Sequence, residues 1–418
     1  MFFWLAIAGG VFLIWFIVVV LFTPGINYRL SHRTSIHDPG FLYTLQSTCQ
    51  AALHHGNSVQ IFTNGTQFYP AMLEAIRGAT GAINMECYIF QPGKIADQFI
   101  AALSERALQG VNVTIVVDAI GSLSLWGSPV RRLRKAGCRI ESYQRLRWYS
   151  LHRLNNRTHR ELLVVDGRIA FVGGAGIADW WAYPGRHARP WRDTMARIEG
   201  PVVAAIQGVA AENWLECCGE ILTGPEYYPD LQSVGTTTAF MVKSSPSDRA
   251  TSSRVAFQLL MEGADHHVRI ATPYFLPDRA LRRALIGVAR RGVNITIIVP
   301  GSATDQKWVR LASRRMWGQL LEAGVRIFEY RDTMMHAKVL VVDGVWSVMG
   351  TTNMDNRSFE HNDEDNVALL DRDVAARLSE DYQRDIEDSD EVTFDQWQRR
   401  PLWEKIAGPF IWILERQQ

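Results

Sequence analysis

Two histidines stand at the same place in a repeated stretch of the chain. HRELLVVDG begins at His159, and HAKVLVVDG begins at His336. Imidazole transfers protons readily near neutral pH, and it can also act as a nucleophile that forms a covalent intermediate. A histidine taken at random is more often structural or exposed. The recurrence of both at one position of a repeat therefore favours a pair of catalytic residues.

The second copy carries further polar residues at regular spacing. Lys338 follows His336 by two positions, so both side chains project to the same face of the expected strand. A loop of small residues at Gly350–Asn353 comes next, and Glu364 follows that loop. This stretch combines the histidine with a cation, hydroxyl groups, an amide and a carboxylate.

An aspartate followed by a glycine ends each copy. Asp166 and Asp343 both come directly after a strand-like run. Aspartate and glycine are typical of turns, so we interpret both aspartates first as turn residues, with direct chemistry as the alternative.

The elements that carry these residues are repeated over most of the chain. Three pairs of similar segments occur in the same order, with the separation of a whole domain: Gly110–Val117 with Gly292–Val299, Lys135–Ile140 with Glu322–Ile327, and His159–Gly167 with His336–Gly344. A period of this length indicates a duplicated domain and not a solenoid. We expect the two copies to face each other about a pseudo-twofold axis.

Strands and helices alternate, which predicts an α/β fold with mixed sheets flanked by helices. The expected strands include Val113–Val117, Leu162–Val165, Ile295–Val299 and Val339–Val342. The expected helices include Ala71–Arg77, Lys94–Leu108 and Arg279–Arg291.

The segment Met1–Phe22 contains no charged side chain. As a helix it would span roughly 33 Å, enough to cross a hydrocarbon core of about 30 Å. Arg29 and Arg33 follow, and the positive-inside rule then places the rest of the chain on the cytoplasmic side. The sequence predicts a transmembrane anchor over 1–23.

The repeat predicts the remaining domain boundaries, with a seam near Thr236–Ser253. We expect a juxtamembrane linker or helix over 24–58, a first domain over 59–235, a second over 236–385 and a C-terminal tail over 386–418. Phe410–Leu414 in the tail is apolar enough to contact a membrane.

Composition narrows the function classes. The 418 residues include 44 basic and 43 acidic side chains, for a net charge of +1, and this balance argues against a nucleic-acid partner. The five cysteines show no CxxC or Cys/His spacing, so neither a disulfide framework nor a metal site is predicted.

The polar pattern resembles a known motif. His336-x-Lys338-x4-Asp343 with the loop GTTN resembles the HKD motif of the phospholipase D superfamily, and His159, Asp166 and the loop GGAG resemble the first motif of its pair. NGTQFYPAMLEAI, WRDTMARIEGP and NMDNRSFEHNDE are similar to segments of bacterial cardiolipin synthases. The resemblance covers the chain from about Val59 to Asp385, and it implies two phospholipase D-type domains.

The resemblance implies a two-step transfer with no cofactor and no metal. His159 would attack phosphorus to form a phosphohistidine, and His336 would protonate the leaving alkoxide and later deprotonate the incoming alcohol. Asp193 and Glu364 match the family's carboxylates that orient the histidines.

It also implies a set of groups that hold phosphate oxygens. Lys338, Asn353 and the hydroxyls near Thr351 match the family's positions. Such donors neutralise the charge that repels nucleophiles from a phosphodiester.

The first motif departs from the family at its lysine, which is Glu161 here. Three explanations stay open. Arg153, Arg157 or Arg160 could supply the missing charge, and we include Arg160 among the expected phosphate-binding residues. The glutamate could be an introduced change, or the protein could be a degenerate member with impaired turnover.

The resemblance implies phospholipid substrates, phosphatidylglycerol with phosphatidylethanolamine as a candidate second lipid, and a place in the bacterial inner membrane. Two basic and aromatic segments, Arg145–Tyr149 and Trp180–Tyr183, are suited to the headgroup zone. The predicted function is phosphatidyl transfer that makes cardiolipin. The alternatives are phospholipase D-type hydrolysis, a nuclease, and a non-catalytic lipid-binding protein, and the sequence leaves open whether the chain forms a homo-oligomer.

Overall fold

A computed structural model of the chain describes residues 2–4, 7–12, 15, 26–144, 156–185, 189–245, 251–402 and 404–405. Most of the expected anchor, the segment Arg145–Tyr149, Arg153 and Phe410–Leu414 lie outside these residues. Within the described ranges, no helix is both long and apolar enough to cross a bilayer.

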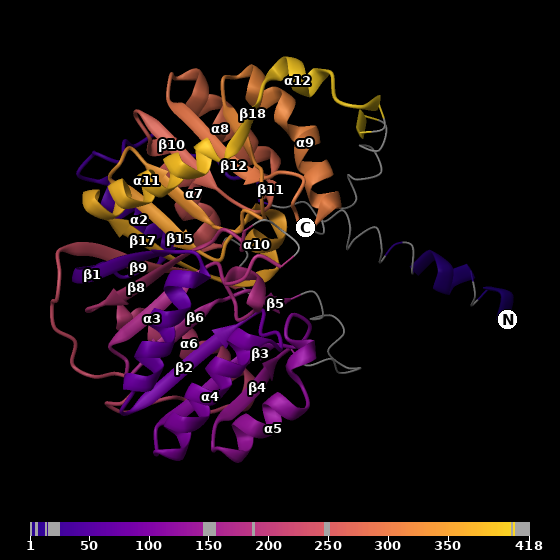
Figure 1. Ribbon diagram of the computed structural model, residues 1–418. Helices are drawn as coiled ribbons and strands as arrows, with labels where there is room; N and C mark the ends of the chain where they lie inside the picture. Colours follow the sequence, from indigo (N-terminus) through magenta and orange to yellow (C-terminus); the bar gives the residue numbers. More distant parts are fainter. Residues whose placement is uncertain are drawn as a thin grey trace.

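The fold is built on one mixed sheet of 16 strands, which runs through the middle of the molecule (Figure 1). From one edge to the centre the order is β4 (Arg139–Tyr143), β3 (Asn112–Asp118), β2 (Ala82–Cys87), β6 (Leu162–Val165), β7 (Ile169–Gly173), β8 (Thr194–Glu199) and β1 (His54–Thr63). It continues with β9 (Thr237–Ser244), β17 (Asn362–Leu370), β15 (Trp346–Gly350), β14 (Val339–Val342), β10 (His267–Ala271), β12 (Asn294–Pro300), β13 (Arg326–Tyr330) and β18 (Ser389–Val392), while the short β5 (Arg157–Thr158) pairs with β17 off this path. Apart from β5 and β18, the strand order is symmetric about the centre of the sheet: counted outward from the centre, equivalent strands of the two copies occupy equivalent places.

Alternating side chains along the strands build a core on each face of this sheet. Leu162 and Val164 of β6 face one layer, while Leu163 and Val165 face the other. In β14, Val339 and Val341 face the first layer, and Leu340 and Val342 face the second. The α/β prediction is therefore confirmed, and the strand period decides which side each residue of the repeat faces.

Helices cover both faces. α6 (Val203–Cys218) and α11 (Arg372–Glu387) share the core on one face. The other face is covered in the first half by α3 (Gly65–Gly78), α4 (Lys94–Leu108) and α5 (Ser128–Lys135), and in the second half by α2 (Phe41–Cys49), α7 (Ser252–Gly263), α8 (Arg279–Arg290) and α9 (Lys307–Glu322). Short elements complete the fold: α10 (Asn356–Glu360), α12 (Phe394–Gln398), β11 (Phe275–Leu276) and β16 (Met354–Asp355).

Most predicted elements lie where the pattern placed them. β6, β14 and α4 have the expected bounds, and β3 and β12 extend one residue further at each end. α3 begins at Gly65 and not at Ala71, because the helix continues through Pro70, whose missing N–H removes only one hydrogen bond.

The two halves of the sheet are joined where β9, the innermost strand of the second half, pairs with β1 of the first half. β9 pairs with β17 at seven positions but with β1 only at His54–Ala239 and Asn57–Thr237, with an irregularity between them. A second link joins the halves where β5 of the first half pairs with the start of β17. This second link is the one that carries the site.

The segment before β1 packs into the second half of the molecule. Ile36, Phe41, Leu45 and Cys49 are buried in the core formed by α7 to α9. The ring of Tyr28 lies 4.6 Å from the guanidinium of Arg254. Residues near the start of the chain therefore belong structurally to the second half.

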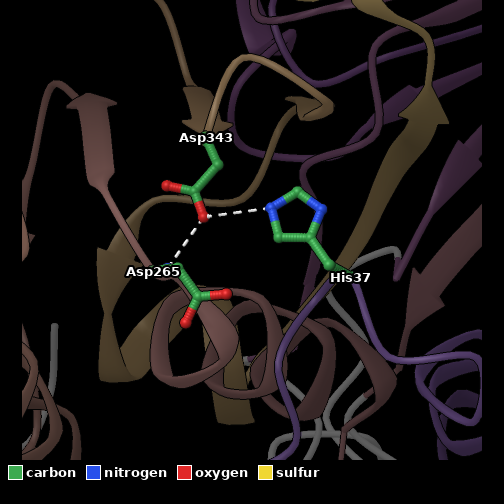
Figure 2. A group of neighbouring side chains, drawn as sticks. All are labelled: His37, Asp265 and Asp343. Carbon is green, nitrogen blue, oxygen red and sulfur yellow. Dashed lines mark hydrogen bonds and ion pairs between the residues drawn. The ribbon is translucent and has the colours of Figure 1, made fainter.

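A polar cluster binds the segment before β1 to the start of β10 (Figure 2). Asp265 is bonded to Arg33 and Ser35, and Nε2 of His37 lies 3.8 Å from Oδ2 of Asp343. The two carboxylates and the imidazole are close enough together to approach a metal ion. Both carboxylates already accept hydrogen bonds from the protein, so we interpret the cluster as a clamp.

Candidate active site

The two histidines are held by the backbone in the same way. The N–H of His159 donates to the carbonyl of Asp363 at 2.8 Å, and the N–H of His336 donates to the carbonyl of Arg192 at 2.7 Å. The next residues along the chain after these acceptors are Glu364 and Asp193. Each histidine is thus positioned by the backbone of the other half, next to a carboxylate of that half.

The first imidazole pairs with the carboxylate of Glu364. Nδ1 of His159 lies 3.0 and 3.1 Å from the two carboxylate oxygens, and the carboxylate is fully buried. An Nδ1–H that donates to this carboxylate leaves the lone pair on Nε2, the tautomer that a nucleophile requires. The side chain of His159 is 14% exposed, so a substrate can reach it.

The second imidazole pairs with Asp193 in the matching arrangement. Nδ1 of His336 lies 2.8 Å from Oδ2 of Asp193, and the indole N–H of Trp181 donates to the same oxygen at 3.0 Å. The rings of Trp181 and Trp191 lie 5.3 and 5.5 Å from the imidazole. Trp181 is fully buried and its ring packs against the histidine, so within Trp180–Tyr183 this side chain belongs to the core and does not face the headgroup zone.

Lys338 lies beside the second histidine and close to both carboxylates. Its Nζ donates to the carbonyl of His336 at 3.0 Å and lies 2.9 Å from Nδ1 of the same residue. The buried ammonium also interacts electrostatically with Asp193, Glu364 and Glu161. The predicted residues from both halves therefore form one cluster.

Burial and charge shift the pKa values within this cluster. Burial lowers the pKa of Lys338, and the surrounding carboxylates oppose that effect. Burial also lowers the pKa of His336, the charge of Lys338 lowers it further, and Asp193 acts in the opposite direction. Both groups therefore lose their protons more easily than they would in water.

The loop after β15 supplies neutral polar groups. Asn353 is buried, and its Oδ1 has no hydrogen-bond partner in the described part of the chain. The Thr351 hydroxyl donates to the carbonyl of Asp365 at 3.2 Å and accepts from the N–H of Asp365 at 3.0 Å. An amide oxygen only accepts hydrogen bonds, so the predicted contact of Asn353 with a phosphate oxygen would need its amide N–H groups and stays a prediction, whereas the hydroxyl of Thr351 is already engaged with β17.

Arg160 does not join the cluster, which corrects the prediction that it binds phosphate. Its guanidinium donates to the carbonyl of Val209 at 3.0 Å and to Glu212 at 2.8 Å, both on α6. The reason is strand period, since Arg160 has the same parity as Leu162 and faces the opposite layer from His159. Arg157 is likewise buried, 3.5 Å from Asp118.

The two aspartates of the repeat close turns. Asp166, with φ of 53°, accepts from the N–H groups of Thr80, Gly81 and Ala82 at 2.7 to 3.2 Å. Asp343, with φ of 50°, accepts from the N–H groups of three consecutive residues that begin at Asp265. These contacts favour the turn-forming interpretation over direct chemistry.

Sequence reasoning missed several residues around the histidines. The ring of Tyr88 meets the ring of His159 edge-on with centroids 5.2 Å apart. Burial raises the pKa of Asp355 to about 6, and the charge of His159 lowers it. Tyr88 directly follows β2, and Asp355 follows the loop GTTN. Their positions after elements of the repeat were the sequence signal that could have placed them near the histidines.

Comparison with known proteins adds an independent finding. The sequence matches the family described as cardiolipin synthase, PLD-like domain, over residues 72–189 and 258–386. It is 33% identical over 350 residues to a cardiolipin synthase of Geobacillus kaustophilus (strain HTA426), which covers 83% of this chain and 70% of that protein. It is 32% identical over 348 residues to cardiolipin synthase 2 of Bacillus anthracis, which covers 82% of this chain and 68% of that protein.

A solved structure shares the fold. The crystal structure of phosphatidylserine synthase from Haemophilus influenzae Rd KW20 superposes with a TM-score of 0.70 at 13% identity, and the match covers 90% of this chain and 98% of that one. At this identity the likeness concerns the fold alone.

Proposed function

The chain belongs to the cardiolipin synthase, PLD-like domain family, and from this premise we propose that it is a phosphatidyltransferase that makes cardiolipin from phosphatidylglycerol and a second phospholipid. The observation that supports this most directly is that each histidine pairs with a carboxylate from the other half of the chain. His159 pairs with Glu364 and His336 pairs with Asp193, and the buried Lys338 lies close to both carboxylates. We infer that the two halves are similar domains related by a pseudo-twofold axis.

In the first step, Nε2 of His159 attacks the phosphorus of the donor lipid. A bond from nitrogen to phosphorus forms, the bond from phosphorus to the headgroup oxygen breaks, and His336 gives a proton to the departing alcohol. Lys338 and Asn353 would hold the phosphoryl oxygens, where charge accumulates. A bound phosphodiester anion would also offset the ammonium of Lys338 and so favour the protonated form of His336.

In the second step, the acceptor lipid completes the transfer. His336, now neutral, removes the proton from the free glycerol hydroxyl of phosphatidylglycerol, and that oxygen attacks phosphorus. The phosphorus–nitrogen bond breaks and His159 is restored, so the two products are cardiolipin and the headgroup alcohol of the donor.

The anchor belongs to this proposal. Residues 1–23 would cross the inner membrane once, with the rest of the chain on the cytoplasmic side, where Arg29 and Arg33 follow the apolar segment. A phosphatidyltransferase needs both lipids, and an anchor keeps the site at the surface that presents them.

The test is lipid turnover by the full chain in mixed micelles with labelled phosphatidylglycerol. His159→Ala and His336→Ala should each lower cardiolipin formation by at least about 1,000-fold, because each removes one participant in covalent transfer. His266→Ala is the matched control, since this histidine is exposed and lies outside the cluster, and it should turn over like the parent.

Other products would redirect the assignment. Phosphatidic acid in place of cardiolipin would mean that water is the acceptor and that the protein is a hydrolase. Binding of phosphatidylglycerol without any product would support a lipid-binding role. Turnover that survives both histidine substitutions would refute the proposed mechanism.

A further inference from the structure

Among the positions at which the first copy of the motif departs from the second, two touch each other. Glu161 stands where the second copy has Lys338, and Gly176 stands where it has Asn353, when the copies are aligned on their histidines. A Cβ atom on Gly176 would lie 2.8 Å from Oε1 of Glu161 and would also overlap the carbonyl oxygen of Ile89. The absence of a side chain at Gly176 provides the space that the Glu161 carboxylate occupies. The two substitutions relative to the second copy are therefore structurally coupled.

The buried carboxylate of Glu161 holds the backbone just after β2. Its Oε1 accepts hydrogen bonds from the N–H groups of Tyr88 and Ile89, both at 3.2 Å. The carbonyl of Tyr88 accepts from the hydroxyl of Ser122 at 2.8 Å, and the carbonyl of Ile89 accepts from the N–H of Ile177 at 2.7 Å. All four backbone polar groups of these two residues are therefore paired, two of them by Glu161.

The same backbone carries the ring that packs on the first histidine. Tyr88 meets His159 edge-on, with an angle of 68° between the ring planes. Gly121 closes the other side, since a Cβ atom there would overlap the carbonyl oxygen of Tyr88. The position of the Tyr88 ring, which packs against the imidazole of His159, therefore depends on how the backbone of Tyr88 and Ile89 is held.

We propose that Glu161 is a positioning residue that holds Tyr88 against His159, and that it is not a damaged phosphate ligand. The inference deepens the proposed function and rests on it for its kinetic readout. A lysine at position 161 would direct its ammonium at two N–H donors, and both amides would lose their acceptor. Glutamine keeps an acceptor oxygen at the same place, so it is the conservative substitution.

This interpretation and the family motif predict opposite results for one substitution. If the glutamate is a lost phosphate ligand, Glu161→Lys restores the motif and raises turnover, and Glu161→Lys with Gly176→Asn raises it further. If it holds the peptide, both changes lower turnover. Glu74→Lys on α3 is the matched control, because it reverses the same charge at an exposed position.

The experiment measures kcat, KM and amide hydrogen exchange over residues 82–91 in the full chain. Glu161→Gln should keep at least about one third of the parent's kcat and its slow exchange at Tyr88 and Ile89. Glu161→Lys should lower kcat by at least about 30-fold with KM changed less than about threefold, and should speed exchange there at least about tenfold. Tyr88→Ala should lower kcat similarly, and its combination with Glu161→Lys should be no worse than either alone.

The results that overturn the inference are distinct from those that overturn the function. A rise in turnover on Glu161→Lys, or unchanged exchange at Tyr88 and Ile89, refutes the positioning role even where cardiolipin is made and His159→Ala abolishes it. A parent that makes no cardiolipin refutes the proposed function, and hydrogen exchange then decides the positioning role by itself.

Discussion

The ammonium of Lys338 lies 2.9 Å from Nδ1 of His336, and this contact bears on the proton affinity of the imidazole. Burial is the largest influence on the ring, and it lowers the pKa of His336 by disfavouring the imidazolium. Two neighbours then act in opposite directions, because the lysine lowers this pKa further and Asp193 raises it. The net effect is a pKa of His336 below its ordinary value, which favours the neutral imidazole.

Lys338→Met removes the positive charge and should raise the pKa of His336. The imidazole should then titrate at a higher pH than in the parent, as measured by the pH dependence of its NMR signals. Lys338→Arg is the control, because it keeps the charge and should move the pKa much less. A pKa that falls or stays constant in the methionine variant would contradict the assigned contact. Turnover should also fall by at least about 100-fold, since the variant loses a phosphate-binding cation.

At the scale of single residues, the repeat marked the two histidines, and the resemblance to the phospholipase D superfamily marked the lysine and the two carboxylates; their catalytic roles stay predictions. His159, His336, Lys338, Asp193 and Glu364 were predicted and lie in one cluster. The prediction for Arg160 failed because strand parity was applied to the second copy and not to the first. Applied there, the period sends Arg160 toward α6, as it sends the matching Ala337 toward α11.

At the scale of elements, Asp166 and Asp343 join the turn after one strand to the start of its neighbour. Each carboxylate accepts several backbone N–H groups, and each aspartate has a left-handed backbone. Aspartate and asparagine tolerate that conformation better than most residues. The carboxylates therefore support β2 and β10, the strands that lead to the site.

Asp166→Ala should lower the free energy of unfolding by about 2–4 kcal/mol, since three backbone N–H donors lose their acceptor and alanine disfavours the positive φ. The measurement is denaturant unfolding at pH 7. Asp166→Asn should lose less, because its amide oxygen still accepts and its backbone tolerates the conformation. If the folded alanine variant loses turnover as completely as His159→Ala does, Asp166 has a direct chemical role.

Element bounds followed from local patterns, because hydrophobic period and turn residues are local properties. β6, β14 and α4 were placed to the residue. The predicted helix Ala71–Arg77 began too late, because α3 starts at Gly65 and continues through Pro70. The short strand β5, which pairs with β17, gave no local signal because only two residues take part.

At the scale of the whole molecule, residues before β1 complete the core of the second half. Phe41 is 1% exposed, and its ring lies 6.1 Å from that of Trp346 on β15. The sequence predicted only a linker or helix here, since no local pattern reveals that a segment packs against strands near the opposite end of the chain. The prediction of the juxtamembrane region therefore missed its packing role.

Phe41→Ala should lower the free energy of unfolding by about 3–5 kcal/mol, because it leaves a cavity in a closed core. Tyr43→Ala, in the same helix but 74% exposed, is the matched control and should change stability by less than about 0.5 kcal/mol. The measurement is equilibrium unfolding monitored by tryptophan fluorescence. Equal effects of the two substitutions would mean that α2 does not belong to this core.

The pairing of each histidine with a carboxylate of the other half has a consequence for how this protein could evolve. In an assembly of two identical single-domain chains, one gene encodes both motifs, and any mutation appears on both sides of the site. Fusion after duplication gives each motif its own codons, so one copy can keep Lys338 and Asn353 while the other acquires Glu161 and Gly176. Since these last two residues share one space, we expect descendants of this gene to inherit or lose them together.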